Sequence, residues 1–375
     1  MIEMPLIFYY PSDKGAPSLV GRSIFEHLYH KKDDLPFSNL SIFSPSKYKR
    51  ELQDKFEDIT IYTEKNICNL PRSIIHIPVS PLVFPNPKFL LHLYSNIRKY
   101  PLILNYHGDF QNEFYLRYKN NHKIDFLNLP SYLLMPYLLA SADHVIVNSF
   151  LLESVIKLKH GIDSANVIPN AVDDYWFGDY TKRLSKMNES CNIFYHGRLS
   201  GEKGVDQLIQ GLYQFTCQAG PTSKVTLYLA GEGPQRRNLH KLSQDLGISE
   251  KVIFLGNLDR DEIKTYLQQV DVAIYPSTFD NFPLSYLEAF ACAQCPVYFS
   301  QKAGIYDFTV KDGYNLNSFE PNVDRICDII KSIYVGEVNS DVVIKQNEFS
   351  KKYTWNKVIN DYIKLYQKAI ITENG

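Results

Sequence analysis

The stretch DVAIYPSTFDNFPLSYLEAFACAQCPVYFS, residues 271–300, contains a strand, a loop, a helix and a second strand in immediate succession. The runs DVAIYP (271–276) and CPVYFS (295–300) are rich in β-branched and aromatic residues, and Pro283–Cys292 is typical of a helix that starts at its proline. Strands that alternate with helices indicate βα units in a parallel sheet. Ligands of such sheets bind beyond the carboxyl ends of the strands, so loop 277–282 is a candidate binding segment.

The same alternation continues along nearly the whole chain. Further strands are expected at 5–10, 40–44, 59–63, 73–80, 102–108, 144–149, 192–197, 224–231 and 252–256. Further helices are expected at 18–29, 87–99, 151–160, 205–218, 234–246, 260–270 and 323–335. The pattern stops in the polar segment GDYTKRLSKMNES, residues 178–190, which has no apolar period and is typical of a linker. We therefore predict two consecutive doubly wound, parallel-sheet α/β domains that face a ligand-binding cleft.

Length and composition also favour two domains, since 375 residues exceed what one core usually supports and 45% of them are hydrophobic. We place the first domain at 1–175 and the second at 176–351. The C-terminal segment EFSKKYTWNKVINDYIKLYQKAI is predicted to be one long amphipathic helix, of which 352–372 returns to the first domain. Its apolar residues recur at helical spacing and need a surface to cover; they are Tyr353, Val358, Tyr362 and Leu365.

The charge balance disfavours a nucleic-acid partner. The chain has 40 Lys and Arg against 41 Asp and Glu, for a formal net charge of −1, whereas nucleic-acid binders normally carry a strongly basic surface. The six cysteines are scattered, and the N-terminal MIEMPLIFYYPSDKG lacks the basic and hydrophobic regions of a signal peptide. These features favour an intracellular, cytoplasmic protein with reduced thiols.

One uncharged run, FLNLPSYLLMPYLLASA from Phe126 to Ala142, raises the question of membrane contact. Pro130 and Pro136 interrupt it, and it is too short for a convincing transmembrane helix. Two interpretations remain open: a buried or interdomain helix, and a helix face that rests on the inner surface of a membrane or on a hydrophobic acceptor.

Two glycine-rich loops follow strands of the second half. In YHGRLSGEKGVDQLI (195–209), a strand ends at Gly197, and the loop presents Arg198 and Lys203 before a helix begins. Loop amides, a helix N-terminus and two cations suit an anion, although an ordinary βα loop with exposed basic residues has the same pattern. In LYLAGEGPQRRNL (227–239), Gly231 and Gly233 could let the backbone approach a ligand, although tight βα turns commonly use glycine.

Titratable residues at the expected strand ends form the other candidates. Asp280 lies in the loop after a strand, and Glu288 lies about a turn and a half into the next helix. The two carboxylates could accept hydrogen bonds from sugar or ribose hydroxyls, or they could be a helix cap and a solvated acid. His107 ends a strand of the first half and could bind substrate or be structural. Cys292 and Cys295 form a CxxC without further metal ligands nearby, which favours packing.

Taken together, these motifs resemble the retaining nucleotide-sugar glycosyltransferases of family 4, which have the GT-B fold of two Rossmann-like domains. GRLSGEKGVDQLI resembles the family's phosphate loop, LAGEGP its Gly-x-Gly-Pro turn, and DNFPLSYLEAFAC its signature of an acid followed eight positions later by Glu. SADHVIVNSFLLESVIKLKHGIDSANVIPNAVD is similar to the end of the family's first domain, and AGIYDFTVKDGYN to its last turn.

The resemblance implies a role for each candidate residue. Arg198 and Lys203 would hold the donor diphosphate, Glu288 would accept both ribose hydroxyls, and Asp280 would bind the donor sugar. His107 would face the donor sugar from the first domain, which would bind the acceptor. Further donor contacts are implied for Gly15, Gly197, Gly231, Gly233, Asn257, Leu258, Asn281, Phe282, Pro283, Leu284 and Gly304.

The family needs no metal or other cofactor, because two cations replace the metal, and none is expected here. The chain departs from the family pattern at five places: Asp280 where Glu is commoner, Lys14-Gly15-Ala16 for a Gly-Gly, Ala171 for Gly, Ala303-Gly304 for a Gly pair, and Asp307 for Glu. The implied function is transfer of a hexose from a nucleoside diphosphate sugar to a glycan or a lipid-linked saccharide. The alternatives are a sugar-nucleotide epimerase of the same fold and a protein that binds sugar nucleotides as a catalytically silent subunit.

Overall fold

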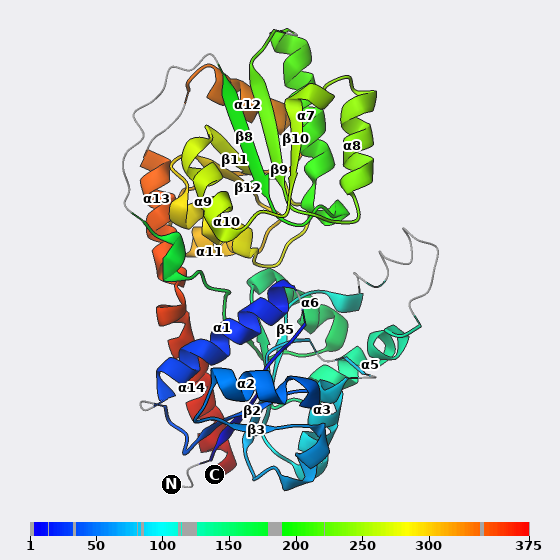
Figure 1. The fold of residues 1–375 in the computed structure, drawn as a ribbon, viewed down its shortest axis with the longest axis vertical. Coiled ribbons are helices and arrows are strands. Elements are labelled where there is room, and N and C mark those ends of the chain that lie inside the picture. Colours follow the sequence, from blue (N-terminus) through cyan, green and yellow to red (C-terminus); the bar gives the residue numbers. More distant parts are fainter. Residues whose placement is uncertain are drawn as a thin grey trace. The chain divides into compact units, whose positions relative to one another are not determined.

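The computed structural model describes residues 4–13, 15–32, 35–80, 82–83, 86–111, 114, 126–178, 190–220, 222–337 and 341–374. The predicted linker, apart from its first and last residues, and Lys14 lie outside the described residues. The chain divides into two compact units, Met1–Asn170 with Trp355–Gly375, and Ala171–Thr354. Each unit carries its own parallel sheet (Figure 1).

In the described part of the first unit, a seven-stranded parallel sheet runs in the order β3-β2-β1-β4-β5-β6-β7. Its strands are β1 (Leu6–Tyr9), β2 (Leu40–Phe43), β3 (Thr60–Tyr62), β4 (Ile74–Ile77), β5 (Leu102–Tyr106), β6 (His144–Val147) and β7 (Ala165–Val167). The described helices are α1 (Ala16–His30), α2 (Lys49–Lys55), α3 (Pro87–Arg98), α5 (Leu129–Ala140), α6 (Phe150–His160) and α14 (Trp355–Asn374).

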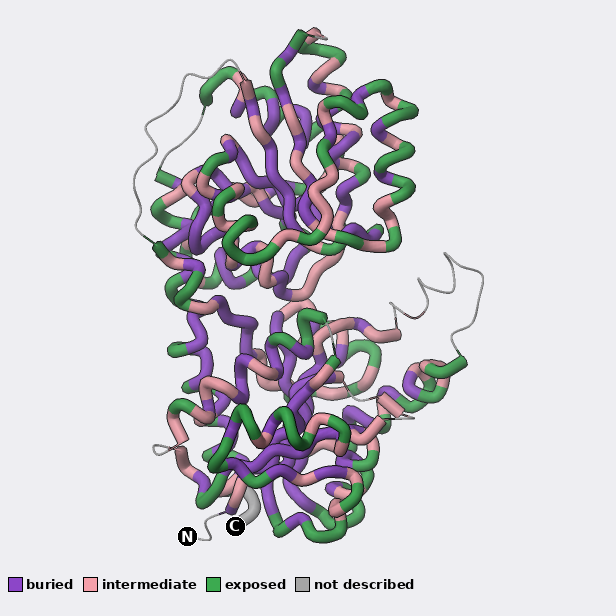
Figure 2. The backbone as a smooth tube through the Cα atoms, in the orientation of Figure 1, coloured by how far each residue is buried: buried purple, intermediate pink, exposed green. Residues whose placement is uncertain are grey.

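Helices cover both faces of this sheet. The Phe25 ring of α1 packs on Phe8 with ring centroids 5.5 Å apart, whereas Leu91 of α3 packs in a cluster with Ile7 and Tyr9. Because neighbouring strand residues point to opposite faces, α1 and α3 lie on opposite sides of the sheet. Figure 2 shows the result as buried strands between helices whose outer sides are exposed.

The helix α14 is tied to the first unit by a buried polar network. His76 of β4 contacts the Tyr366 hydroxyl through Nδ1 and Asn105 Oδ1 through Nε2, both at 2.7 Å, and Asn105 Nδ2 donates to the Tyr362 hydroxyl at 3.2 Å. Burial lowers the pKa of His76 to about 3, so the ring is neutral at physiological pH. Its Nε2–H therefore donates to Asn105, and its Nδ1 accepts from Tyr366.

In the described part of the second unit, a six-stranded parallel sheet runs in the order β10-β9-β8-β11-β12-β13. Its strands are β8 (Cys191–His196), β9 (Val225–Ala230), β10 (Val252–Gly256), β11 (Val272–Tyr275), β12 (Val297–Ser300) and β13 (Ser318–Phe319). Its described helices are α7 (Val205–Ala219), α8 (Arg236–Asp245), α9 (Arg260–Gln269), α10 (Leu284–Cys292), α11 (Ile305–Lys311), α12 (Val323–Tyr334) and α13 (Asp341–Ser350). The helix α7 contacts α8 and α12, and α10 contacts α9 and α13. The predicted α/β class with two parallel sheets is confirmed.

The C-terminal segment corrects one prediction. The predicted single helix from Glu348 is interrupted, because α13 ends at Ser350, a 3-10 helix covers Lys351–Tyr353, and α14 begins at Trp355. Tyr353 is therefore not part of the α14 stripe and instead packs on Phe349 and Phe282, with ring centroids 5.0 and 5.9 Å apart. Apolar spacing alone did not reveal this one-turn break, nor the short strands β7 and β13.

The uncharged run forms α5, which is only partly covered. Met135 and Leu139 are buried, while the side chains of Leu133 and Tyr137 are 61% and 74% exposed. Among the described residues, no helix combines the length and the hydrophobicity needed to cross a membrane.

Candidate functional site

The first glycine-rich loop leaves the carboxyl end of β8 and is held close to the loop after β11. Gly204 adopts a φ of 65° and is the N-terminal residue that precedes α7. A Cβ atom at Gly204 would lie 2.1 Å from the carbonyl oxygen of Pro276, which directly follows β11. Only glycine fits this position, because both the positive φ and the close backbone contact exclude a side chain.

The second glycine-rich loop packs against the first. A Cβ at Gly231 would lie 2.0 Å from Gly197 O, and a Cβ at Gly233 would lie 2.2 Å from Leu199 O. The amide of Gln235 donates to the same Leu199 carbonyl at 2.9 Å. Gly231 and Gly233 thus have a structural reason to be glycine, and any direct contact of theirs with a donor stays a prediction.

Lys203 and Asp280 form an ion pair at this edge of the sheet. Lys203 Nζ donates to Asp280 Oδ2, and the two side chains are only 20% and 14% exposed. The main chain of Asp280 is held in turn, since its carbonyl accepts from the Gly304 amide at 2.9 Å. Asp280 is not the cap of α10, because Pro283 occupies the cap position without a side-chain hydrogen bond. The structure therefore brings together one of the two cations, Lys203, and one of the two acids, Asp280, that the sequence analysis selected.

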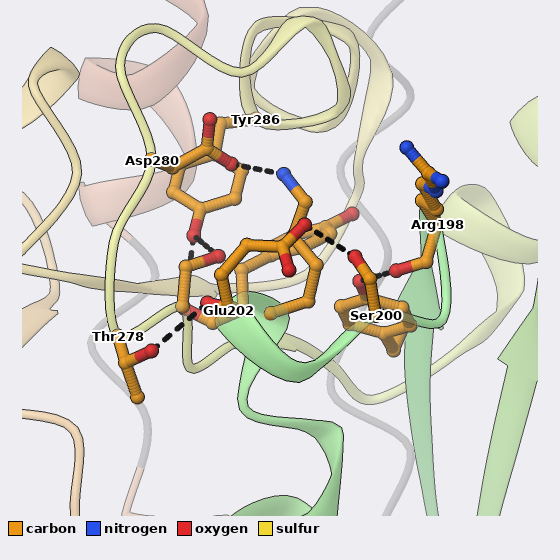
Figure 3. Close-up of polar contacts among 10 residues, drawn as sticks. Arg198, Ser200, Glu202, Thr278, Asp280 and Tyr286 are labelled. Atoms are coloured by element: carbon orange, nitrogen blue, oxygen red, sulfur yellow. Dashed lines mark hydrogen bonds and ion pairs between the residues drawn. The ribbon is translucent and has the colours of Figure 1, made fainter. Parts of the chain in front are cut away.

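Further polar contacts, which the sequence analysis did not predict, hold the loop after β8 against the loop after β11 (Figure 3). Ser200 Oγ donates to the Glu202 carboxylate, and the Glu202 carbonyl accepts from the Thr278 amide at 2.8 Å and from Thr278 Oγ1 at 3.2 Å. Tyr286 of α10 donates from its hydroxyl to Ser277 Oγ at 2.8 Å. The two bonds between Glu202 and Thr278 join the β8 loop, which carries Lys203, to the β11 loop, which carries Asp280.

Arg198 is the other cation of the loop and is exposed. Its carbonyl accepts from the Tyr195 hydroxyl at 3.2 Å, whereas its guanidinium takes part in none of the contacts drawn in Figure 3. Within the described residues the guanidinium has no ion-pair or hydrogen-bond partner. It is available to an anion from solution.

Glu288 is held by a hydrogen-bonded chain that starts in the core. Its Oε2 lies 3.1 Å from His196 Nε2 at the end of β8, and His196 Nδ1 lies 2.7 Å from the Tyr275 hydroxyl at the end of β11. The two ring nitrogens of His196 thus connect the Tyr275 hydroxyl to the Glu288 carboxylate, and Nε2–H is the group that can donate to the carboxylate. The pKa of Tyr275 is well above its usual value, because burial disfavours the phenolate. The second oxygen, Oε1, has no partner among the described residues and can accept from a ligand hydroxyl.

The remaining predicted donor residues of this unit lie after β10, after β11 and at the start of α10, and they differ in burial. Phe282 and Pro283 are buried, and Phe282 packs edge-on against Phe308 with ring centroids 5.0 Å apart. Asn281, Leu258 and Leu284 are partly buried, and Asn257, just after β10, is exposed. Phe282 therefore contributes to packing, and ligand contacts of this group stay predictions.

Gly15 and His107 belong to the first unit. Gly15 has a φ of 129° and precedes α1 after β1, and His107 follows β5. His107 Nε2 lies 2.8 Å from the Pro78 carbonyl, and burial lowers the His107 pKa to about 4. The ring is thus neutral near pH 7 and donates from Nε2 to Pro78. Its contact with the donor sugar stays a prediction.

The cysteine pair is buried between the end of α10 and β12. Cys292 and Cys295 are buried, and Cys295 Sγ lies 3.8 Å from the Leu267 carbonyl. Within the described ranges, no three His, Cys, Asp or Glu side chains are grouped as they would be around a metal ion.

Comparison with known families places this site in context. Residues 179–352 match the family described as glycosyl transferases group 1. This match spans most of the second unit, Ala171–Thr354. The matched range contains all the loop residues described above, from Gly197 to Gly304.

Relatives and solved structures extend the comparison. The uncharacterized glycosyltransferase YqgM of Bacillus subtilis is 27% identical over 237 residues, 62% of this chain and 63% of that protein. The D-inositol 3-phosphate glycosyltransferase of Acidothermus cellulolyticus is 24% identical over 248 residues, 62% of this chain and 54% of that protein. The aligned segments thus span about half to two thirds of the length of these relatives.

The Anabaena protein Alr3699/HepE has been solved in complex with UDP and with UDP-glucose. Its UDP complex superposes on this chain with a TM-score of 0.72 at 18% identity. The superposition covers 97% of this chain and 100% of that one. At this identity the likeness concerns the fold. The predicted GT-B fold of two Rossmann-like domains is confirmed.

Proposed function

We propose that this protein is a retaining, metal-independent glycosyltransferase that moves a hexose from a nucleoside diphosphate sugar to a glycan or lipid-linked acceptor bound by the first domain. The observation that carries the proposal is the grouping of Arg198, the Lys203–Asp280 pair and the Glu288 carboxylate at one sheet edge of the unit that matches the glycosyl transferases group 1 family. The relative solved with UDP-glucose supports a nucleotide-sugar donor.

The cations would act on the leaving group. As the glycosidic bond breaks, negative charge develops on the diphosphate, and preorganised cations stabilise that charge more in the transition state than in the ground state. Arg198 is exposed and unpaired in the described structure, and Lys203 can exchange its Asp280 partner for a phosphate oxygen. This exchange would free the Asp280 carboxylate to accept a hydrogen bond from a sugar hydroxyl.

Glu288 would bind the nucleotide. A carboxylate accepts through both oxygens, and the two ribose hydroxyls are a matched pair of donors. Oε2 already accepts from His196, which fixes the orientation of the carboxylate while Oε1 stays open. Retention would follow from attack on the leaving group's own face, with a phosphate oxygen taking the acceptor proton.

The test is donor turnover by single variants. Lys203→Ala and Arg198→Ala should each lower turnover of the accepted sugar nucleotide by about 10²–10³-fold, and Glu288→Ala should mainly raise the donor KM. Lys331→Ala and Arg237→Ala, at exposed positions on α12 and α8, are the matched controls. Unchanged turnover in all three site variants would refute the proposal.

The same assay separates the two alternatives. Incubation with the donor alone would yield an epimer if the protein is an epimerase. Tight donor binding without transfer or hydrolysis would indicate a catalytically silent binding protein. A screen of UDP, GDP and ADP by thermal shift comes first, since a ligand that binds only the folded state raises the unfolding temperature.

We also propose that α5 rests on a membrane surface in a peripheral manner. Leu133, Leu134 and Tyr137 of this helix are 61%, 42% and 74% exposed. Phe126 and Leu127, which precede the helix, are 75% and 74% exposed. The stretch carries no charge, so apolar contact rather than charge would drive binding.

Vesicle flotation tests the membrane proposal. The wild-type protein should float with phosphatidylcholine vesicles, and a variant with Leu133→Ser, Leu134→Ser and Tyr137→Ser should not. Leu158→Ser on α6, which removes an 85% exposed leucine elsewhere on the same unit, is the control and should float. Equal flotation of the triple variant and the wild type would contradict the proposal.

A further inference from the structure

The first unit has a topological switch point at the carboxyl edge of its sheet. In the order β3-β2-β1-β4-β5, the chain reverses its direction of winding between β1 and β4. The helices that follow the two strands, α1 and α3, lie on opposite faces, so their loops separate at this point. Crevices beyond the strand ends at such a switch point are where α/β sheets bind ligands.

Lys88 lies at this switch point. It is in the first turn of α3, which follows β4, and its backbone amide donates to the Asn86 side chain at 3.1 Å. The residue is only 5% exposed. Within the described part of the chain, its ammonium group has neither a hydrogen bond nor an ion pair. A buried cation without a partner is costly, so its position requires an explanation.

The charge of Lys88 is retained near neutral pH. Burial lowers the Lys88 pKa to about 8, against a smaller raising effect of Asp13. The group is therefore mostly protonated at pH 7, because the pH is about one unit below that value.

The neighbouring groups do not neutralise this cation. Asp13, after β1, is exposed; its charge raises the Lys88 pKa, but the two side chains do not form an ion pair. His107, after β5, is neutral, and the charge of Lys88 helps to keep its pKa low. The Tyr9 hydroxyl of β1 lies 3.5 Å from Asn86 Oδ1 and is also neutral. The N-termini of α1 and α3 add partial positive charge at the same edge.

We propose that Lys88 binds an anionic group, a phosphate or a carboxylate, that belongs to the acceptor. The proposal rests on the function proposed above, in which the first domain holds the acceptor, and it adds that the acceptor carries a negative charge. A single buried lysine at a helix N-terminus is suited to one compact anion, and binding would supply the partner that the ammonium lacks.

The experiment compares Lys88→Met and Lys88→Arg with the wild type and with Lys49→Met, a control at an exposed lysine on α2. Binding of sulfate and of inorganic phosphate is measured by calorimetry while the donor site is saturated with the nucleoside diphosphate that the thermal screen selects. Lys88→Met should weaken anion binding at least about tenfold. Lys88→Arg should retain most of it, and Lys49→Met all of it. Equal binding by Lys88→Met and the wild type overturns the proposal.

Two further readouts separate ligand binding from a structural role. Without ligand, Lys88→Met should unfold at a higher temperature than the wild type, because an uncompensated buried charge is removed; a lower unfolding temperature would indicate a structural lysine and would overturn the proposal. Sulfate keeps its charge from pH 7 to pH 9, so wild-type sulfate affinity should fall about tenfold over that range as Lys88 loses its proton. A constant affinity would count against Lys88 as the ligand.

The nucleoside diphosphate present in these titrations shows whether the anion that Lys88 binds belongs to the acceptor or to the donor. If the nucleoside diphosphate displaces sulfate, and Lys88→Met weakens nucleotide binding, the anion belongs to the donor diphosphate and the acceptor assignment is wrong. If no nucleoside diphosphate binds but sulfate binding still depends on Lys88, the proposed transferase function fails while the anion site stands. Simultaneous binding of both ligands supports the full proposal.

Discussion

Gly204 must be a glycine for two independent reasons, its backbone conformation and its contact with a neighbouring carbonyl. The φ of 65° strains any residue with a side chain, and a Cβ would overlap the Pro276 carbonyl. Gly247 has a nearly identical φ of 68° but nothing within 4 Å of its Cβ position. Alanine substitutions at Gly204 and Gly247 therefore separate the cost of backbone strain from the cost of steric overlap.

We expect Gly247→Ala to lower the free energy of unfolding by about 1–2 kcal/mol, the cost of the left-handed backbone alone. Gly204→Ala should cost more and should also weaken nucleotide binding, because the loop that carries Lys203 must move away from β11. Denaturant unfolding and calorimetric titration with the nucleoside diphosphate measure the two effects. Equal losses in both variants would show that the contact with Pro276 is unimportant.

The chain from Tyr275 through His196 to Glu288 supplies a second test at this scale. Tyr275→Phe leaves His196 Nδ1 buried without its hydrogen-bond partner, which should cost about 1–3 kcal/mol of unfolding free energy. It should also raise the donor KM, because His196 would no longer be held against Glu288. Tyr213→Phe, at a tyrosine that is 38% exposed, makes the same chemical change and should leave both quantities unchanged.

At the scale of the element, the packing of α14 on the first unit depends on His76, whose ring must stay neutral. The folded-state pKa of His76 is about 3, well below the ordinary value of 6.5, so the unfolded chain takes up this proton first as the pH falls. The stability that the neutral ring provides is present above pH 6.5 and is lost progressively between pH 6.5 and pH 3. Each unit of pH in that window corresponds to about 1.4 kcal/mol for a single group.

We therefore expect the wild-type unfolding temperature to fall between pH 7 and pH 5, and to fall less in His76→Gln. The glutamine keeps a polar group beside Asn105 but does not titrate. Thermal melts at the two pH values measure the difference. His92 and His107, with pKa values lowered by burial to about 4, add to the slope in both proteins and so do not affect the comparison. Equal pH dependence in the two proteins would exclude His76 as a source.

At the scale of the whole molecule, two units with separate sheets predict two unfolding events. Calorimetry of the full chain should resolve two transitions, since multidomain proteins depart from two-state behaviour. A nucleoside diphosphate should raise mainly the transition that Gly204→Ala lowers, while His76→Gln should lower the other one. A single transition that responds equally to both variants would mean that the units do not unfold separately.

The sequence by itself determined the alternation of strands and helices and most of the loops that carry the candidate residues. Local spacing is sufficient for this, because a strand, a glycine-rich turn and a helix start such as Pro283 are encoded within a few neighbouring positions. The same local signal did not show the break between α13 and α14.

Only the tertiary structure decided which side chains meet. Lys203 and Asp280 are 77 positions apart, and His196 and Glu288 are 92 apart, so their contacts exist because β8 and β11 are neighbours in the sheet. Gly231 and Gly233 proved to be necessary for the contact between two loops, and Lys88 proved to be buried without a partner. Strand order and helix packing set these facts, and neither can be read from residue spacing along the chain.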